Sequence, residues 1–385
     1  MTEAVIVQAV RSPVGRRNGG LSGLHPADLS AQVLNALVGR AGIDPQVVDD
    51  VIWGCVGQGG EQAMDIARTA LLAAGWPESV PGVTVDRQCG SSQQSVNFAA
   101  ASVIAGHYDV VVAGGVESMS RVPMGSTLAG GGDPFSPMFM QRYGVHPNQG
   151  VGAEMIAERW GFDRTALDEF SLASHEKAAA AQDAGVFQDQ IVGIEVADAD
   201  GRVTAVNQDE GVRRGGTVEK MAQLKPAFRE DGVIHAGNAS QISDGAAALL
   251  IMSAEKAASL KLKPLARIHT AALAGADPVI MLTAPIPATE KALKRSGLTV
   301  DDIGVFEVNE AFAPVPMAWL KDIGADEKKL NPNGGAIALG HPLGGSGARI
   351  MTTMLFHMRD KGIQYGLQTM CEGGGQANAT ILELL

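Results

Sequence analysis

The sequence predicts an α/β fold in which the second half of the chain repeats the first. Short apolar runs alternate with helical stretches in each half, a pattern typical of βα units on mainly parallel sheets. Asp50 stands 39 residues before Cys89. Asp302 also stands 39 residues before His341, so one offset of 252 residues superposes both pairs. This shared spacing indicates an internal duplication.

The elements of the two halves are expected in the same order. The N-terminal residues lead almost directly into a strand, and an apolar helical stretch then ends at Gly42, as a second one does at Gly297. An apolar run from 80 to 85 predicts a short buried strand before Cys89. The small residues that follow, with few helix breakers, predict a buried helix over 95–105. Farther on, 109–115 corresponds to 365–371.

A long segment between the halves interrupts this alternation. It begins with clusters of glycine and proline such as 130–134, and it contains two helical stretches, at 152–160 and 165–181. It closes before an apolar strand at 246–252. The expected organisation is a first half formed by 1–118 plus 243–264, an inserted domain at 119–242, and a second half at 265–385.

Three side chains with reactive groups stand beside helix starts or glycine-rich turns. Cys89 precedes a helix, whose N-terminal partial positive charge and unpaired N–H groups favour a thiolate. His341 lies in the glycine-rich turn 340–347, and Cys371 precedes the three glycines at 373–375. One thiol, one imidazole and a second thiol are the parts of a nucleophile–base site.

Four segments, taken in order, resemble the motifs of the thiolase family, the acetyl-CoA acyltransferases. They are 85–94 around Cys89, 308–312 with Asn309, 340–349 with His341, and 371–379 with Cys371. The resemblance covers essentially the whole chain. It implies that the duplicated halves form a five-layered αβαβα sandwich and that the insertion is a loop domain over the active site.

The resemblance also implies roles for individual residues. Cys89 would be the acylated nucleophile, His341 its base, and Cys371 the acid that protonates the leaving carbon. The N–H groups of Cys89 and Gly373 would hold the tetrahedral oxyanion, while Asn309 and His341 would serve the enolate oxygen.

Coenzyme A enters this comparison as a co-substrate, with no permanently bound cofactor expected. Ser240 resembles the serine that meets the pantetheine, and Arg213 resembles the arginine near the nucleotide end. Arg213 belongs to the basic stretch 202–229, which carries a net charge of +3 and could cradle a phosphorylated ligand. A solvated loop face is the other interpretation of that stretch.

One departure from the family pattern bears on the substrate. Short-chain biosynthetic members carry His-Met where this chain has Asn148 and Gln149. The difference favours a degradative 3-ketoacyl-CoA thiolase that accepts longer or bulkier acyl groups, from fatty acids or steroid side chains. An acetoacetyl-CoA thiolase acting in condensation is the first alternative, and a non-catalytic lipid-binding or scaffold subunit of the same fold is the second.

Composition limits the partners and the compartment. A net charge of −12 argues against nucleic acid and anionic membrane surfaces as partners. The three cysteines lack the close pairing typical of metal ligands, so no metal site is expected, and their odd number favours a reducing compartment. We therefore expect a cytoplasmic protein, and the resemblance implies an enzyme with acyl-CoA substrates that forms a homodimer or homotetramer.

Overall fold

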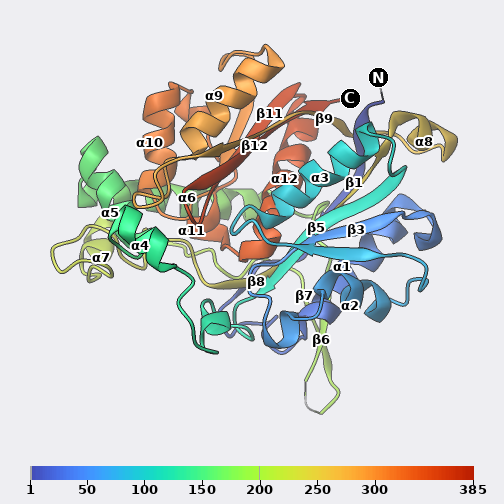
Figure 1. Ribbon diagram of the computed structural model, residues 1–385, viewed down its shortest axis with the longest axis horizontal. Coiled ribbons are helices and arrows are strands. Elements are labelled where there is room, and N and C mark those ends of the chain that lie inside the picture. The colour runs from blue at the N-terminus through green and yellow to red at the C-terminus, as the bar shows by residue number, and fades with distance from the viewer. Residues whose placement is uncertain (1, 199) are drawn as a thin grey trace.

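The computed structural model describes residues 2–198 and 200–385, and it contains two similar α/β halves with two long helices between them (Figure 1). The strands of the first half are β1 (Ala4–Arg11), β2 (Gly15–Arg16), β3 (Asp50–Gly54), β4 (Gly82–Val85), β5 (Val110–Ser118) and β8 (Ser243–Ser253). Its helices are α1 (Pro26–Ala41), α2 (Ile66–Ala73), α3 (Ser91–Ile104) and α8 (Ala254–Ser259).

The second half is built from fewer strands. They are β9 (Ala266–Gly275), β10 (Val305–Val308), β11 (Tyr365–Glu372) and β12 (Gln376–Leu384). Its helices are α9 (Pro285–Ser296), α10 (Pro314–Ile323), α11 (Ala336–Leu339) and α12 (Leu343–Lys361). Four single-turn 3₁₀ helices lie at Pro45–Val47, Gly60–Gln62, Ser126–Leu128 and Glu327–Lys329.

The two halves share one strand topology, which confirms the predicted duplication. In the first half the strand order is β1-β8-β5-β3-β4, and in the second it is β9-β12-β11-β10. β3 runs parallel to β5, as β10 does to β11. β8 runs antiparallel to both of its long neighbours, as does β12. In the described part of the chain, β4 has no equivalent in the second half.

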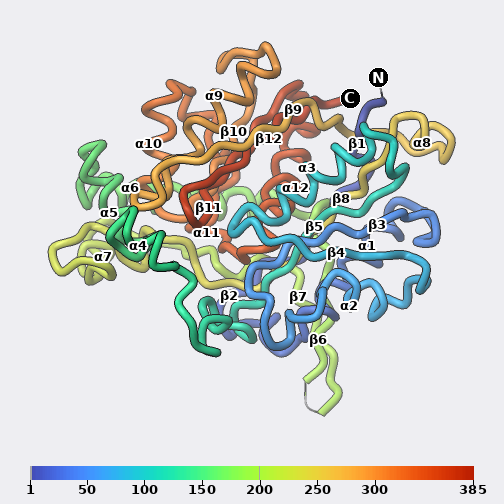
Figure 2. Tube along the Cα trace, in the orientation of Figure 1, coloured from blue at the N-terminus to red at the C-terminus, as the bar shows by residue number. Residues whose placement is uncertain are grey.

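Helices α3 and α12 form a central layer between the two halves (Figure 2). Both pack on β5 and β8 of the first half and on β12 of the second. Helix α1 covers the outer face of the first sheet, and α9 covers the outer face of the second. The resulting helix–sheet–helix–sheet–helix order is the five-layered αβαβα sandwich that the resemblance implied. β1 and β9 join the two sheets through only two residue pairs.

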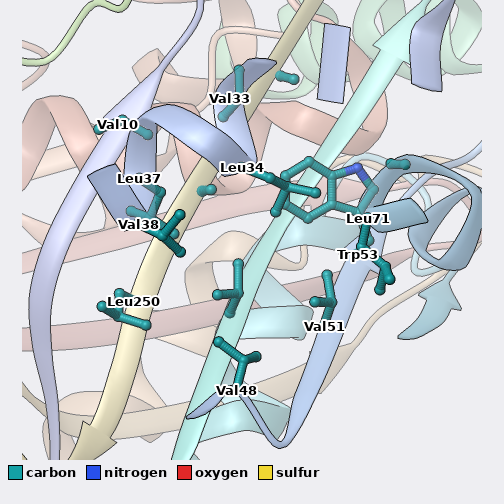
Figure 3. Close-up of a cluster of buried hydrophobic side chains, with 14 of the residues drawn as sticks. Val10, Val33, Leu34, Leu37, Val38, Val48, Val51, Trp53, Leu71 and Leu250 are labelled. Atoms are coloured by element: carbon teal, nitrogen blue, oxygen red, sulfur yellow. The ribbon is translucent and has the colours of Figure 1, made fainter. Parts of the chain in front are cut away.

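The outer layer of the first half shows why α1 docks where it does. Val33, Leu34, Leu37 and Val38 form one apolar face of the helix, and Figure 3 shows them turned toward β3 and β8. Trp53 of β3, with no exposed surface, fills the space between them and α2. Burial of apolar side chains at helical spacing is the main source of stability for such a layer.

The inserted segment leaves the first sheet after β5 and returns through β8. Its elements are α4 (Pro137–Tyr143), α5 (Gln149–Trp160), α6 (Arg164–Asp183), β6 (Ile194–Ala197), β7 (Val203–Val206) and α7 (Val218–Ala222). The helices gather on one side of the sandwich, and the β6–β7 hairpin projects from it (Figure 1). A buried bidentate ion pair, with Arg11 Nη1 2.7 Å from Asp209 Oδ1, ties the segment to β1. The exact boundary residues of the three units stay a prediction.

Within the described residues, no helix combines the length and the apolar character needed to cross a membrane.

At the N-terminal ends of the central helices α3 and α12, the helix backbone packs directly against the backbone of strands β3 and β5. A side chain on Gly54, at the end of β3, would lie 2.4 Å from Ser92 N and 2.7 Å from Gly344 O. A side chain on Gly115 of β5 would lie 2.3 Å from the same Gly344 oxygen. Real Cβ atoms do not approach other atoms so closely. Glycine is therefore required at these positions because the first turns of α3 and α12 occupy the space.

Gly54→Ala should destabilise the protein by about 1–3 kcal/mol, because relief of the overlap must move backbone. A matched control is Gly39→Ala on α1, where nothing lies within 4 Å of the added methyl group. That change should be neutral or stabilising, since alanine is the better helix former. Urea unfolding of both variants measures the difference, and equal stabilities would contradict the contact described here.

Candidate active site

Cys89 lies in the turn that joins β4 to α3, as predicted. Gln88 has a φ of 49°, in the left-handed region that non-glycine residues seldom adopt. Asp86 Oδ1 stabilises this conformation by accepting a hydrogen bond from the Gln88 N–H at 2.7 Å. The Ser91 hydroxyl accepts another from the Arg87 N–H at 2.9 Å. The turn holds Cys89 at the N-terminal end of α3, where its side chain is buried.

The turn that carries His341 is fixed by Glu117, at the end of β5. Its carboxylate accepts four hydrogen bonds, from the N–H groups of Val56, Gly57 and Gly344 and from Gln62 Nε2, at 2.7–3.0 Å. The donor from Gly344 belongs to the first turn of α12. Glu117 therefore links the first half of the chain to the segment that presents the histidine.

Hydrogen bonds determine which nitrogen of His341 carries its proton. Ser346 Oγ donates to the Pro342 carbonyl at 2.8 Å, and a carbonyl can only accept. The hydroxyl must therefore accept from His341 Nδ1, which lies 2.6 Å away. In the neutral ring this leaves the lone pair on Nε2. Asn309 Nδ2 lies 3.4 Å from that nitrogen, so the asparagine amide and the Nε2 edge of the imidazole face each other.

The segment around Asn309 is anchored by the residue that follows it. The Glu310 carboxylate is buried and accepts from Ser174 Oγ at 2.6 Å and from Asn331 Nδ2 at 2.9 Å. A third bond comes from the Ile337 N–H at 3.2 Å. Helix α6 of the insertion and α11 of the second half thus hold Asn309 in place.

Cys371 reaches the site from the other sheet. It lies near the end of β11, opposite Ala377 of β12, and its thiol is close enough to Cys89 for the charge of that residue to raise the pKa of Cys371. Gly373, in the hairpin that follows, packs on the nucleophile turn, and a Cβ there would come 2.9 Å from Gln88 Oε1. The structure thus places Cys371 and Gly373 beside the turn that carries Cys89, and it places Asn309 beside His341.

Burial controls the protonation of the resting site. It raises the pKa of Cys89 to about 12, and the charge of Glu372 adds to this effect. Burial also lowers the pKa of His341 to about 3, with a further contribution from the Arg349 guanidinium. The pKa of Cys371 is raised well above its ordinary value for the same reason. The resting site is therefore a thiol beside a neutral imidazole, and the expected stabilisation of a thiolate by the helix dipole is outweighed.

The two positions that depart from the short-chain pattern have different surroundings. Asn148 is exposed and caps α5, its side chain accepting from the Val151 N–H at 3.1 Å. The side-chain amide of Gln149 instead lies beside the Cys89 thiol, and its hydrogen bond lowers the pKa of that thiol against the larger effect of burial. Of the two residues, Gln149 is the one that faces the reacting centre.

The predicted coenzyme A contacts lie apart from each other. Ser240 is half-buried, and its N–H donates to the Ala311 carbonyl at 2.9 Å, which places it beside the Asn309 segment. Arg213 lies on the loop over α6, where its N–H donates to His175 Nδ1 at 3.1 Å. It lines a cavity of about 320 Å³ together with Arg214. Ser240 is near the reactive side chains, and Arg213 borders a polar hollow in the insertion.

Several residues that support the site had no signal in the sequence. Glu117, Ser346 and Glu372 are ordinary polar residues until the fold places them against the catalytic candidates. Of these, only Ser346 had a weak signal, the Gly-x-Ser pattern after His341. A serine five residues after the histidine, in the first turn of the following helix, can place its hydroxyl against the imidazole. Among residues 2–198 and 200–385, no group of three or more His, Cys, Asp or Glu side chains is arranged to hold a metal ion.

The fold and the buried side chains match one known family. Residues 4–255 match the family model of the thiolase N-terminal domain, and residues 262–384 match that of the thiolase C-terminal domain. The chain belongs to the thiolase family. The resemblance inferred from the four motifs is thereby confirmed, as is the acyltransferase class.

Relatives of this thiolase match along its full length. A steroid 3-ketoacyl-CoA thiolase of Mycobacterium tuberculosis is 52% identical over 394 residues, covering 100% of this chain and 95% of that protein. A 3-ketoacyl-CoA thiolase of Erwinia tasmaniensis is 46% identical over 390 residues, which cover 100% of this chain and 100% of that protein. The crystal structure of an acetyl-CoA acetyltransferase of Bacillus anthracis superposes with a TM-score of 0.92 at 40% identity, over 100% of this chain and 99% of that one.

Ser346→Ala should lower kcat while leaving KM nearly unchanged. Without the hydroxyl, Nδ1–H of His341 loses its acceptor and the ring can turn or change tautomer, so Nε2 is no longer held as the proton acceptor. Loss of such a buried hydrogen bond costs about 1–3 kcal/mol. Steady-state kinetics over a range of pH measures the effect.

Ser95→Ala is the matched control, because the Ser95 hydroxyl also donates to a carbonyl four residues earlier, that of Ser91 at 3.0 Å. This bond lies in α3 and touches no imidazole. If both serine variants lose the same activity, the hydroxyl of Ser346 has no particular role in orienting His341.

Proposed function

We propose that this thiolase is a degradative 3-ketoacyl-CoA thiolase that transfers an acyl group through Cys89. The observation that carries the proposal is the placement of Cys89 and His341 just before the two central helices, with the Cys371 thiol of β11 close to Cys89. The named relatives at 52% and 46% identity support the degradative type. Fatty-acyl and steroid side-chain substrates both fall within that type.

The proposed reaction proceeds in two half-reactions. The Cys89 thiol gives its proton to Nε2 of His341, and the sulfur attacks the 3-keto carbon. The N–H groups of Cys89 and Gly373 stabilise the oxyanion. Cleavage of the carbon–carbon bond leaves acyl-Cys89 and the enolate of acetyl-CoA, whose oxygen is met by Asn309 and His341. Cys371 protonates the enolate carbon and becomes a thiolate. That thiolate takes the proton of the coenzyme A thiol, whose sulfur attacks acyl-Cys89, and the Cys89 sulfur leaves and recovers its proton from His341.

The protonation states of Cys89 and His341 in the resting site suit this order of events. A neutral Nε2 lone pair can accept the thiol proton, and the imidazolium that forms then offers Nε2–H to an oxyanion. If the thiol had already lost its proton to solvent in the resting site, the neutral His341 would have no Nε2–H to offer to an oxyanion. Proton transfer and attack are thus coupled, and the site carries little net charge until substrate arrives.

Two other functions use parts of the same arrangement. An acetoacetyl-CoA thiolase working toward condensation would use the same residues, and the match to an acetyl-CoA acetyltransferase structure keeps it as the alternative. The polar side chain of Gln149 beside Cys89 favours the degradative type. A non-catalytic lipid-binding or scaffold subunit would not need Cys89, His341 and Cys371, all of which this chain retains in one buried site.

We infer that coenzyme A is a co-substrate held by Ser240 and Arg213, with no permanently bound cofactor. Ser240 lies near the reacting groups, where the pantetheine must end. Arg213 borders a hollow in the insertion and offers positive charge to a phosphate group, whereas Arg214 on the same hollow is paired with Asp183. We infer a cytoplasmic enzyme because all three cysteines are free thiols.

We infer a homodimer as the smallest assembly, with a homotetramer as a pair of such dimers. Among the residues that the structure describes, strand β4 pairs with β3 on one side only, so its other edge can accept a further strand. Val83 on that strand and Phe98 on α3 are each 43% exposed. A second copy could extend the sheet in the antiparallel direction and cover both side chains.

Incubation with a 3-ketoacyl-CoA should add an acyl group to the peptide that contains Cys89. Cys55 serves as an internal control, because it is equally buried, and burial together with Glu117 raises its pKa. Mass spectrometry of the digested protein measures the labelling. Acylation at Cys55 with an unlabelled Cys89 would contradict the proposed nucleophile.

Cys371→Ala separates the two thiols. This variant should still form acyl-Cys89 but lose the exchange of acetyl-CoA α-protons with solvent deuterium, because no acid remains at the enolate carbon. Undiminished exchange would remove Cys371 from the proposed reaction.

The degradative type predicts that kcat/KM rises from acetoacetyl-CoA toward medium-length or ring-bearing substrates. Each buried methylene contributes about 0.8 kcal/mol, roughly fourfold in specificity, until the acyl pocket is full. Thiolysis over a series of 3-ketoacyl-CoA chain lengths, with a steroid side-chain analogue included, measures the trend. A steady fall from acetoacetyl-CoA onward would support the condensing alternative instead.

A further inference from the structure

Glu372 is a buried acid that the proposed reaction does not use. It follows Cys371 directly at the end of β11, and alternation along the strand turns its side chain to the opposite face, toward the central helices. The residue has no exposed surface. Within the described part of the chain, no side chain donates a hydrogen bond to either of its carboxylate oxygens. A buried carboxylate without partners is strongly disfavoured and takes up a proton instead.

The carboxyl group lies against the residue that follows the nucleophile. A side chain on Gly90 would come 2.0 Å from Glu372 Oε1 and 2.8 Å from Asn378 Nδ2. The same Nδ2 donates to the Gly90 carbonyl at 3.1 Å. Glu372 and Asn378 therefore meet on one side of the nucleophile turn, and glycine at position 90 makes room for them.

The side-chain oxygen of Asn378 receives no hydrogen bond, and a protonated Glu372 has a donor to offer. Its Oδ1 is buried and, among the residues that the structure describes, has no hydrogen-bond partner. The Glu372 carboxyl and the Asn378 amide border the same position beside Gly90, where a carboxylate would offer the amide only acceptors, whereas a protonated carboxyl group offers one O–H donor. The protonated form of Glu372 thus suits both unpartnered groups at once.

Few charged or titratable groups face this carboxyl group. The turn before α3 contributes Arg87 and the Cys89 thiol, with Asp86 exposed on its outer side, and β11 contributes the Cys371 thiol. Arg87 Nη1 donates to Gln376 Oε1 at 3.2 Å, and no salt bridge joins it to Glu372 in the described residues. Burial raises the pKa of Glu372 to about 8, against smaller opposite effects of the Arg87 charge and of the Asn378 backbone N–H.

We propose that Glu372 is a positioning residue of the active site that works in its protonated form. As a neutral acid it holds Asn378 against Gly90 and so fixes the turn that presents Cys89. As a carboxylate it releases that contact and places a negative charge beside the nucleophile, which opposes ionisation of the thiol. The proposal rests on Cys89 being the nucleophile, but its test does not require turnover.

The test compares Cys89 alkylation by iodoacetamide in the wild-type protein and in Glu372→Gln over a range of pH. Glutamine keeps a donor for Asn378 and cannot ionise. Well below the pKa of about 8 the two proteins should react at the same rate, because both side chains are neutral. Above that pH the variant should react several-fold faster, since the wild-type carboxylate opposes the thiolate. A ratio of rates that stays constant over the whole pH range would overturn the proposal.

Asp86→Asn is the control, because it removes an exposed negative charge near Cys89 while keeping the acceptor for the Gln88 N–H. Its rate relative to wild type should not change with pH, and a change equal to that of Glu372→Gln would refute a specific role for the buried acid. The wild-type protein gives a test that needs no variant. Its logarithmic rate should rise less steeply with pH through about 8 than on either side, as for two coupled groups. A uniform slope through that pH would count against the proposal.

Glu372→Ala distinguishes positioning from charge alone. It removes both the donor and the charge, so kcat should fall while the alkylation rate at high pH still exceeds that of wild type. Recovery of kcat in Glu372→Gln is expected if the donor to Asn378 holds the turn. Equal loss of kcat in both variants would show that the O–H donor does not position Cys89.

Discussion

The two halves of this thiolase approach each other through backbone, and the geometry of the site depends on that contact. Gly54, Gly115 and Gly344 leave no side chains between the ends of β3 and β5 and the start of α12. The first turns of α3 and α12 can therefore lie close together, and Ser92 Oγ accepts a hydrogen bond from the Ala348 N–H at 2.9 Å across this junction. Glu117 reinforces the same junction, because its four donors come from both halves. A residue larger than glycine at this junction would separate Cys89 from His341.

Burial then sets the chemistry of the groups that meet there. In a site of low polarity, neutral forms are favoured at rest, so the thiol keeps its proton and the imidazole lacks a second one. The converging helix ends contribute partial positive charge that is most useful once an oxyanion forms. The arrangement thus stabilises charge that appears during the reaction more than charge that is present before it.

The sequence was informative where a local pattern or a repeat carried the information. The offset between Cys89 and His341 predicted that both would stand at equivalent helix starts, and the shared strand order bears this out. The protonation of Cys89 was not predictable, because the helix dipole is a local feature whereas burial depends on the whole sandwich. Gln149 shows the same limit: the sequence marked it as unusual, but only the folded insertion places its amide beside the thiol.

The duplication has a consequence for symmetry. Two identical halves meeting about a twofold axis could offer only one kind of residue at the meeting point, because the axis would repeat it. Covalent joining of the halves removes that restriction while it keeps the shared scaffold. Position 89 can then hold a thiol and position 341 an imidazole, at equivalent points of the same architecture. The two halves can therefore differ at equivalent positions, one with a proton donor and the other with a proton acceptor, because they belong to a single continuous chain.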